Sequence, residues 1–555
     1  MTNCAQCKAE FEIADDERCH REQLSPTFSD RKYLIPDPTF CPDCRHQHRM
    51  AFRNERTVYK RVCDSCKKSI ISIYPSGTDF PVYCAECWWA DRWDPMKYGS
   101  DYDFSRPFFD QLRELIIQVP KIYADIFDCE NCEYTNISIR NRNCFMAFAV
   151  MDCEDCFYSR KLRQCKNVLD STYVYNSEWC YECLDCTRCY NSAYLESCSQ
   201  CADSLFLADC TGCNYCIGCT NLRNKSYHIF NRPVSPEEFQ EKLRQIQGHF
   251  SAYQILRIKF EELKRKTIHR SDHNNNVQEC RGDYLENCKN CFDCYDVGDT
   301  EGARYVTDAM TSADFSMDCT ATTSHSSYNY ESVSTTDASY CCFTNRARDG
   351  AHHLIYCDSI YASQELFGCV GLRHKKYCIL NKQYSKAQYE ALAPKIIEHM
   401  KRAGEWGQFF PASLSPFGYN ETLAQEFFPL NREQAKIQGW SWRNQDPKEY
   451  QKQPYTIPDY IVEVKGNILE VVLACEKTGR NFRVIPQELE FYRRQNLPLP
   501  RFHPDARHVD RFSLRNPRHL WSRTCAKCSK PIQTTYSPDR PEKVACETCY
   551  LKEVY

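Results

Sequence analysis

Small and apolar residues recur at every third position between residues 129 and 219, and cysteine fills sixteen of these positions. The other positions of this frame, such as Ala147, Val150, Leu162 and Ser171, are also small or apolar. The residues between them are mostly Asp, Glu, Arg, Asn and Tyr. A strand alternates with period two and a helix with period 3.6, so neither explains a strict period of three. The frame therefore marks the inside of a different kind of coil.

A twelve-residue unit of the form C-x2-C-x2-S-x2-L starts at 153, 186 and 198. Four inward residues per coil predict a narrow β-solenoid, in which buried cysteine acts as a small hydrophobe. The pattern is similar to the twelve-residue β-helices of some insect antifreeze proteins, a likeness of fold alone. Two other interpretations stay open. The run Cys180-x2-Cys183-x2-Cys186 echoes ferredoxin spacing without its Cys-Pro ending, and some of these thiols could bind zinc.

A second, less regular copy follows. Residues 367–385 match 217–235 at an offset of 150, but the frame slips across the Ser-, Thr- and Tyr-rich residues 320–340. We therefore expect loops or bulges in this copy. Each copy ends in the capping-box form S-x-x-E/Q, at Ser235 and Ser385, which predicts a helix after both.

Paired CxxC knuckles stand near both ends of the chain. Residues 41–74 align without a gap with residues 503–536 at an offset of 462. Two knuckles separated by 17 residues suit a tetrahedral Cys4 zinc ribbon with no open ligand position. Two further N-terminal knuckles predict a treble-clef-like zinc site. The expected zinc ligands are Cys4, Cys7, Cys41 and Cys44; Cys63, Cys66, Cys84 and Cys87; and Cys525, Cys528, Cys546 and Cys549.

The C-terminal copy of the treble-clef-like site is damaged. Its corresponding positions are Cys475, Thr478, His503 and Ala506. Two plausible ligands cannot hold zinc firmly, so this copy is expected to fold without metal.

These patterns predict a mainly β protein with two narrow β-solenoid (β-helix) repeat modules, helical caps, and zinc-ribbon or treble-clef modules at both ends. Residues 404–470 are rich in aromatic residues and proline, which favours an ordered connector or a strap across another domain over a flexible linker. The expected order is a treble-clef-like zinc module (1–61), zinc ribbon (62–100), helical linker (101–125), Cys-rich β-solenoid (126–232), helices (233–270), second β-solenoid (271–383), helix (384–403), connector (404–470), degenerate copy of the first zinc module (471–523) and zinc ribbon (524–555).

Composition adds a cellular setting. The 555 residues carry a net charge of -3, so any basic surface must be local. No apolar run reaches the roughly 20 residues that span a bilayer, and the N-terminus lacks the profile of a secretory signal. We therefore expect a cytoplasmic protein with no membrane contact. In a reducing compartment, 40 cysteines should be metal ligands or buried thiols rather than disulfides.

One local basic stretch follows Cys44. Arg45, Arg49, Arg53 and Arg56 fall on one helical face, and the C-terminal copy repeats them although its metal ligands are lost. A row of guanidinium groups suits phosphate, so these arginines are the candidate nucleic-acid contacts. The plainer interpretation is a solvated face, or arginines paired with acids of the neighbouring ribbon. The repeated residues are Arg507, Arg511, Arg515 and Arg518.

The chain resembles a family of uncharacterised Cys-rich proteins that we associate with small-genome, candidate-phylum bacteria. The resemblance rests on CPDCRHQHRMAFRNER, YCAECWWADRWDP, GCVGLRHKKYCILNKQYS and CETCYLKEVY, and it spans nearly the whole chain. It implies no particular activity.

The sequence contains no recognisable catalytic motif, and three functions follow as hypotheses. The first is a non-catalytic zinc scaffold whose terminal modules bind RNA or a ribonucleoprotein. The second is a protein–protein adaptor that uses Trp88, Trp89, Trp93 and the aromatic residues of 404–420. The third is an iron–sulfur redox or metal-storage protein that uses the solenoid cysteines.

Overall fold

A computed structural model describes residues 2–444 and 449–555. The chain forms two compact units, each built from segments distant in sequence. Unit 1 joins the N-terminal segment up to residue 124 with residues 272–444 and 518–520. Unit 2 joins residues 125–271 with the described part of 445–517 and with 521–555. Each unit therefore pairs one terminal cysteine module with one parallel sheet.

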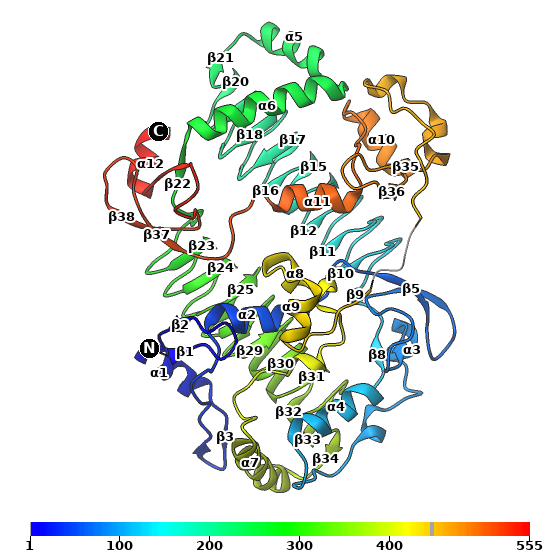
Figure 1. The fold of residues 1–555 in the computed structure, drawn as a ribbon, viewed down its shortest axis with the longest axis vertical. Coiled ribbons are helices and arrows are strands. Elements are labelled where there is room, and N and C mark those ends of the chain that lie inside the picture. Colours follow the sequence, from blue (N-terminus) through cyan, green and yellow to red (C-terminus); the bar gives the residue numbers. More distant parts are fainter. Residues whose placement is uncertain (1, 445–448) are drawn as a thin grey trace. The chain divides into compact units, whose positions relative to one another are not determined.

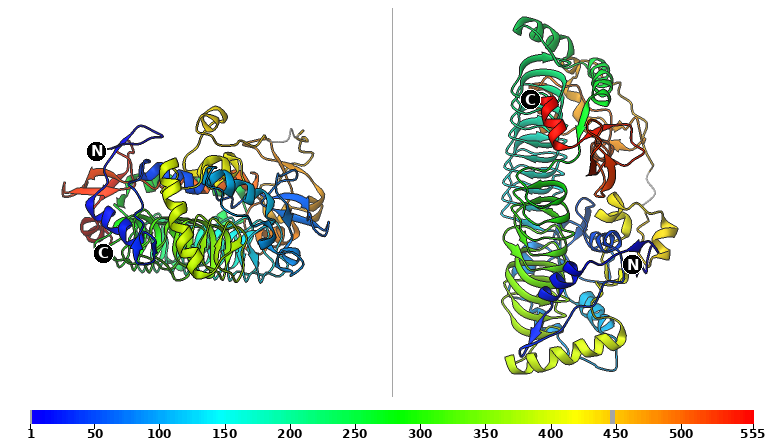
Figure 2. Two further views of the ribbon diagram at one scale, coloured as in Figure 1. Left: turned by 90° about the horizontal axis from the view of Figure 1, so that it is seen from below. Right: turned by 90° about the vertical axis from the view of Figure 1, so that its left-hand side faces the viewer.

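The first parallel sheet belongs to unit 2 and has 13 strands within the described residues. Its parallel strands pair at an offset of twelve residues, as Phe148 opposite Arg160 and Arg160 opposite Thr172 show. Figure 2 shows these short strands stacked one on the next. The strands are β9 (Ile126–Phe127), β10 (Asn136–Ile139), β11 (Phe148–Met151), β12 (Arg160–Arg163), β13 (Lys166–Leu169), β14 (Thr172–Tyr175), β15 (Glu178–Tyr181), β16 (Leu184–Thr187), β17 (Tyr190–Glu196), β18 (Leu205–Ala208), β19 (Asn214–Thr220), β20 (Ser226–Ile229) and β21 (Arg232–Pro233).

The residues of the three-residue frame point into the interior of this stack. The frame cysteines from 144 to 219 form one buried cluster with the valines and leucines of the same frame. Ser171 Oγ accepts the N–H of Cys183 at 3.1 Å, so a frame side chain satisfies a backbone donor in the next turn. The Cys183 thiol in turn donates to the carbonyl of Tyr181 at 3.5 Å. Serine and cysteine therefore suit this interior because they are small and can also hydrogen-bond the backbone.

The period of three has a backbone cause. The residue before each frame position has a positive φ close to 50°, as at Asp152 (54°), Asp155 (53°) and Tyr158 (52°). Left-handed conformations are uncommon outside glycine, and Asn and Asp tolerate them best. One such residue in every three turns the chain repeatedly, which keeps each following side chain on the inside. The frame thus records a backbone corner as well as a buried position.

The second parallel sheet belongs to unit 1 and has 12 strands among the described residues. Some of its steps are thirteen residues long, such as Thr307 opposite Thr320, and the register shifts between Arg281 and Gly282. These insertions explain the slipped frame in the sequence. The strands are β23 (Arg281–Glu286), β24 (Phe292–Gly298), β25 (Thr307–Ala309), β26 (Ala313–Asp314), β27 (Met317–Thr320), β28 (Ser326–Ser327), β29 (Tyr330–Val333), β30 (Thr336–Ile355), β31 (Asp358–Tyr361), β32 (Gln364–Phe367), β33 (Lys376–Ile379) and β34 (Lys382–Gln383).

Each sheet ends in a short antiparallel strand followed by a helix, as the matching sequences predict. Strands β21 and β34 pair antiparallel with β20 and β33. Helix α5 (Pro236–Ile246) begins after Ser235, whose Oγ accepts the N–H of Glu238 at 3.1 Å. Helix α7 (Lys386–Ala403) begins with the complete capping box of Ser385 and Gln388. In unit 2 a further helix follows, α6 (Phe250–Lys266).

The terminal modules share their elements at the offset predicted from the sequence (Figure 1). Helix α2 corresponds to α11, and the hairpin β5–β6 corresponds to β37–β38. The elements of the module in unit 1 are β1 (Thr2–Asn3), β2 (Glu10–Phe11), α1 (Asp15–Leu24), β3 (Thr27–Phe28), β4 (Arg31–Lys32), α2 (Pro42–Met50), β5 (Tyr59–Val62), β6 (Ser69–Ser72), β7 (Val82–Tyr83), α3 (Ala85–Trp89), α4 (Phe108–Gln118) and β8 (Lys121–Ile122). Those in unit 2 are β22 (Ile268–Arg270), β35 (Leu473–Ala474), β36 (Asn481–Phe482), α10 (Pro486–Arg494), α11 (Pro504–Phe512), β37 (Trp521–Thr524), β38 (Pro531–Thr534), β39 (Lys543–Ala545) and α12 (Glu547–Val554).

The first part of the aromatic connector packs against unit 1. It contains helices α8 (Leu423–Phe427) and α9 (Arg432–Ile437). Phe417 stacks on Tyr74 with ring centroids 5.3 Å apart, and the indole N–H of Trp406 donates to the carbonyl of Leu34 at 2.9 Å. Within the connector, residues 404–444 belong to unit 1 and residues 449–470 belong to unit 2, and residues 445–448 lie outside the described residues.

At the level of fold class, the structure confirms a protein that is mostly strand, with large parallel sheets and cysteine groups at both ends. Within the described ranges, no helix is both long enough and apolar enough to span a bilayer.

Candidate metal centres

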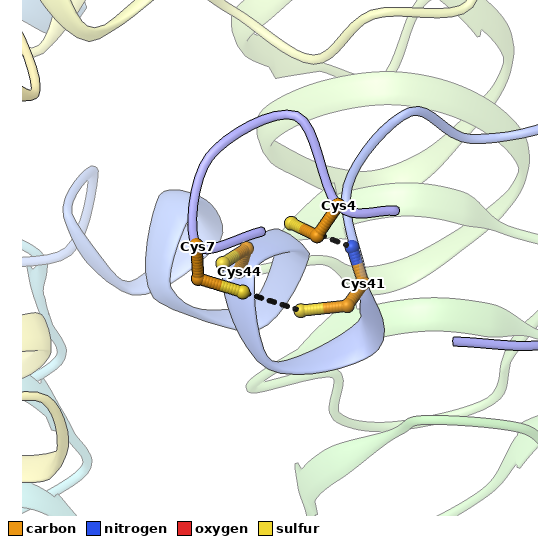
Figure 3. Close-up of side chains that lie close together, drawn as sticks. All are labelled: Cys4, Cys7, Cys41 and Cys44. Carbon is orange, nitrogen blue, oxygen red and sulfur yellow. Dashed lines mark hydrogen bonds between the residues drawn. The ribbon is translucent and has the colours of Figure 1, made fainter. Parts of the chain in front are cut away.

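Three groups of four cysteine thiols lie close enough together to hold a metal ion, and the described part of the chain contains no other such group. Within each group all the sulfur atoms are within 4.8 Å of one another. Figure 3 shows the thiols of the first group turned toward a common centre. The groups are Cys4, Cys7, Cys41 and Cys44; Cys63, Cys66, Cys84 and Cys87; and Cys525, Cys528, Cys546 and Cys549.

The spacing of the sulfur atoms tests whether zinc fits. Tetrahedral zinc with Zn–S bonds of about 2.3 Å requires neighbouring sulfurs about 3.8 Å apart. The corresponding distances are 3.6 Å from Cys7 to Cys41, 3.7 Å from Cys66 to Cys84, and 3.8 Å from Cys528 to Cys546. These three distances, one from each group, agree with the spacing expected of a tetrahedral Cys4 site.

The first knuckle of each group is the same tight turn, whereas the second knuckle begins a helix, with Cys41, Cys84 and Cys546 as the N-cap residues. The N–H of Cys63 donates to the carbonyl of Lys68 at 2.8 Å, and the N–H of Lys67 donates back to the carbonyl of Cys63 at 2.9 Å. Cys4 and Cys525 begin turns with the same pair of bonds. This turn presents both thiols of a CxxC pair on one side.

Backbone donors stabilise thiolates at these centres. The N–H of Cys84 donates to Sγ of Cys63 at 3.2 Å, and matching bonds run from Cys41 to Cys4 and from Cys546 to Cys525 at 3.3 Å each. Burial raises the pKa of the Cys63 thiol, but the surrounding N–H groups outweigh it and lower this pKa to about 7. A thiolate is the form that binds metal.

The damaged copy keeps the turn without a ligand set. The N–H of Cys475 donates to the carbonyl of Arg480 at 2.8 Å, as in the intact knuckles. His503 instead caps α11, with Nδ1 accepting the N–H of Asp505 at 3.0 Å. The turn and the helix start of this copy thus keep their hydrogen bonds although two of the four ligand positions hold Thr478 and Ala506.

The frame cysteines of the sheets form no group of this kind within the residues the structure describes. Their sulfurs hydrogen-bond carbonyls, as Cys186 does to Leu184 (3.2 Å) and Leu195 (3.4 Å). In the second sheet, burial raises the pKa of the Cys378 thiol to about 12.

The arginine row of unit 1 is buried against the second sheet. Arg45 Nε donates to Asp318 at 3.0 Å. Arg49 Nη1 donates to Asp318 at 3.1 Å and to Glu331 at 2.8 Å. Arg45 is 4% exposed and Arg49 is 0% exposed. Both acids have the left-handed backbone conformation of the corner residues in the sheet, so helix α2 packs along one row of these corner residues.

The C-terminal row repeats this arrangement against the first sheet. Arg507 pairs with Asp170, and Arg511 Nη1 lies 3.3 Å from Asp170 and 3.0 Å from Glu182. Asp170 and Glu182, which lie twelve positions apart, are likewise left-handed corner residues of their sheet. The duplication therefore preserves an arginine–carboxylate clamp between helix and sheet.

The other four arginines of the two rows are largely withdrawn from solvent. Arg53 is buried, the side chains of Arg515 and Arg518 are each 6% exposed, and Arg56 is half-buried. This placement contradicts the exposed phosphate-binding face expected from the sequence, because ion pairs inside the protein occupy the guanidinium groups of Arg53, Arg515 and Arg518. The carboxylate partners are Glu55 for Arg53, Asp185 for Arg515 and Asp296 for Arg518.

The tryptophans considered for an adaptor role pack within unit 1. Trp88 is fully buried and Trp93 nearly so, whereas Trp89 is 38% exposed. The guanidinium of Arg373 lies 5.0 to 5.7 Å from the three ring centroids. This cluster is therefore an internal cation–π contact with one exposed ring.

The fold and these centres define a class: a protein with large parallel sheets and three Cys4 groups that could hold a metal ion. Searches of protein-family models and of curated proteins find no match. Among solved structures, one similar chain is a crystal structure from Desulfovibrio desulfuricans G20 with a provisional assignment as an acetyltransferase. It is 8% identical, with a TM-score of 0.10 over 50% of this chain and 82% of that chain, and this likeness carries no argument.

Proposed function

We propose that the protein is a zinc-binding scaffold with three structural Cys4 zinc ions. The observation that carries the proposal is the spacing of the thiols, 3.6 to 3.8 Å between neighbouring sulfurs of different knuckles. Four thiolates leave no position for a substrate, so the zinc ions hold structure.

The two sheets are, in this proposal, narrow β-solenoids filled by cysteine. The twelve-residue register and the buried frame support this reading. The hydrogen bonds from frame thiols to carbonyls favour a packing role over iron–sulfur or storage chemistry, since each thiol already has backbone partners. The solenoids would act as rigid cores for the terminal modules.

Zinc and the arginine clamps would cooperate in unit 1. Cys41 is the N-cap residue of α2 and Cys44 lies in its first turn, so a metal ion there fixes the start of the helix. The same helix carries Arg45 and Arg49 into the buried ion pairs with the second sheet. Losing this zinc should therefore loosen the contact between module and sheet.

The burial of the arginines removes the observation that suggested RNA or a ribonucleoprotein as the partner of the terminal modules. The function that the structure supports best is that of a zinc-dependent scaffold.

The test is zinc stoichiometry in single-site variants, measured by native mass spectrometry. Cys66→Ser and Cys528→Ser, at exposed ligand positions, should each lower the count from three zinc ions to two. Cys198→Ser, at a buried frame position, is the matched control and should keep all three. Unchanged zinc in both ligand variants would refute the proposed sites.

A further inference from the structure

Two cavities occupy the same place in the duplicated modules. One lies in unit 1 and the other in unit 2, and four lining positions of the first recur in the second. Three of them are related by the offset of 462, and the fourth pair consists of the acids that accept from Arg49 and Arg511. The corresponding residues are Phe40 and Phe502, Arg45 and Arg507, His48 and Asp510, and Glu331 and Glu182.

The cavity in unit 1 is the larger, at about 310 Å³. Small-molecule sites start near 300 Å³ and are mostly apolar with a few placed polar groups. Its walls are the aromatic rings of Phe40, Phe109, Phe409 and Phe410, together with His48. A flat ring system of one or two rings fits these dimensions and walls.

The charged residues that line this cavity are Arg45, Glu331 and Glu405, and Glu405 already accepts the backbone N–H groups of Phe108 and Phe109. Glu331 accepts from Arg49 through Oε2, and its Oε1 lies 3.7 Å from Nε of Arg45. Arg45 donates from Nε to Asp318 and from Nη1 to the carbonyl of Phe40. Its Nη2 is buried and has no hydrogen-bond partner among the described residues. A buried donor of this kind calls for an acceptor.

Charge favours a neutral ligand over an anion. Arg45 and Arg49 are balanced by Asp318 and Glu331 in the same buried cluster. A free anion would add an uncompensated charge to a balanced site, which is unfavourable. A neutral group with adjacent N–H and C=O would satisfy the carboxylate and the guanidinium together.

The cavity in unit 2 is a narrowed copy. Its volume is about 50 Å³, because helix α6 supplies Arg257, Phe260 and Glu261 as one wall. The position of His48 holds Asp510, and Arg511 joins the lining. The room for a ring is lost in unit 2 while the arginine–carboxylate clamp is kept, so only the cavity in unit 1 is large enough for a small-molecule ligand.

We propose that the cavity in unit 1 binds a nucleobase with a lactam edge, the N–H beside C=O found in guanine and uracil. The ring stacks between the phenylalanine side chains. The lactam N–H donates to Glu331, and its carbonyl accepts from Arg45. Adenine and cytosine lack an N–H next to a carbonyl and do not meet both groups. No zinc ligand lines the cavity, but Arg45 and His48 belong to helix α2, which begins at Cys41, so binding is measured on the zinc-loaded chain and zinc content is checked separately.

The test is calorimetric titration of the full zinc-loaded chain with four nucleosides. Guanosine and uridine should bind, and adenosine and cytidine should bind at least tenfold more weakly. Equal affinity for all four, or no binding of guanosine and uridine up to about 1 mM, would overturn the proposal. Titration with the hexanucleotide U6 distinguishes the source, because tighter binding than uridine assigns the site to a base within RNA and equal binding assigns it to a free nucleoside.

Two variants locate the binding. Phe109→Ala removes one wall and should weaken guanosine about tenfold, as expected for lost stacking on one aromatic ring. Thr39→Trp fills the mouth from an exposed position and should abolish binding. Phe502→Ala, at the matching position of the narrowed cavity, is the control and should leave binding unchanged. Loss of binding in the control alone would place the ligand elsewhere and refute the assignment.

Discussion

Replacing Arg511 by methionine removes the positive charge from one side of a buried ion cluster. Its Nη1 lies 3.0 Å from a carboxylate oxygen of Glu182 and 3.3 Å from one of Asp170. The exposed fractions of the three side chains are 3%, 16% and 0% for Arg511, Glu182 and Asp170. Methionine keeps much of the apolar stem of arginine, so the change is chiefly electrostatic.

The expected loss in the free energy of unfolding is about 3–5 kcal/mol, because a buried carboxylate keeps its desolvation cost when its partner is removed. Arg507 still pairs with Asp170, so Glu182 is the acid left without compensation. Replacing Arg511 and Glu182 together by methionine should recover most of the loss, since a buried pair is worth little against packed apolar side chains.

The assay is urea unfolding of the zinc-loaded chain, with hydrogen exchange of peptides from α11 and from β13 to β16 to assign the effect to unit 2. Arg140→Met is the control in the same unit. Arg140 pairs with Asp152 at 2.7 Å, but its side chain is 54% exposed, so the expected loss is below about 1 kcal/mol. Equal losses in Arg511→Met and Arg140→Met would refute the clamp.

Three further predictions concern the interior and the pH response. Cys198→Ser should lower the free energy of unfolding by about 1–3 kcal/mol, measured by urea unfolding. Cys198→Arg should prevent unit 2 from folding, because Cys198 is buried in a narrow interior. Normal folding of the arginine variant would contradict the assignment of Cys198 to the interior. Ser171→Ala should lower the free energy of unfolding by about 1–3 kcal/mol, because it leaves the N–H of Cys183 unpaired. Ser199 lies outside the frame, so Ser199→Ala should lower it by less than about 0.5 kcal/mol. The reverse order would contradict the role assigned to the Ser171 hydrogen bond. Burial, aided by the charge of Arg49, lowers the pKa of His48 to about 4. The protonation of His48 alone should therefore lower the free energy of unfolding of unit 1 by about 3 kcal/mol as pH falls from 6.5 to 4. His48→Gln should remove that part of the pH dependence in unfolding titrations, and a variant that follows the parent would show that His48 does not titrate in this way.

The repeated core was accessible from the sequence because burial imposed its own period. The cysteines, serines and leucines of the frame could be assigned to the inside without knowing the backbone angles. The sequence pattern assigns the residue before each frame position to the outside, but it does not reveal that this residue has a positive φ. Its signal was present in the many Asp and Asn residues there, but Tyr158, Trp179 and Phe206 take the same conformation and obscure it.

The metal groups were also accessible, since a CxxC turn brings its thiols together locally and the paired spacing does the rest. The groups that the arginines contact could not be predicted from the sequence. A row such as Arg45 and Arg49 has the same pattern whether it meets phosphate or carboxylate, and Asp318 lies 269 residues from Arg49. The repeated acids Asp170 and Glu182, twelve positions apart on the outside, were the signal that could have identified the clamp.

Zinc-edge X-ray absorption on the purified chain tests the central claim most directly, because it reports the element and its ligands together. The account predicts zinc with four sulfur neighbours at about 2.3 Å, averaged over three equivalent sites. Nitrogen or oxygen neighbours, fewer than four sulfurs per zinc, or iron in place of zinc would contradict it.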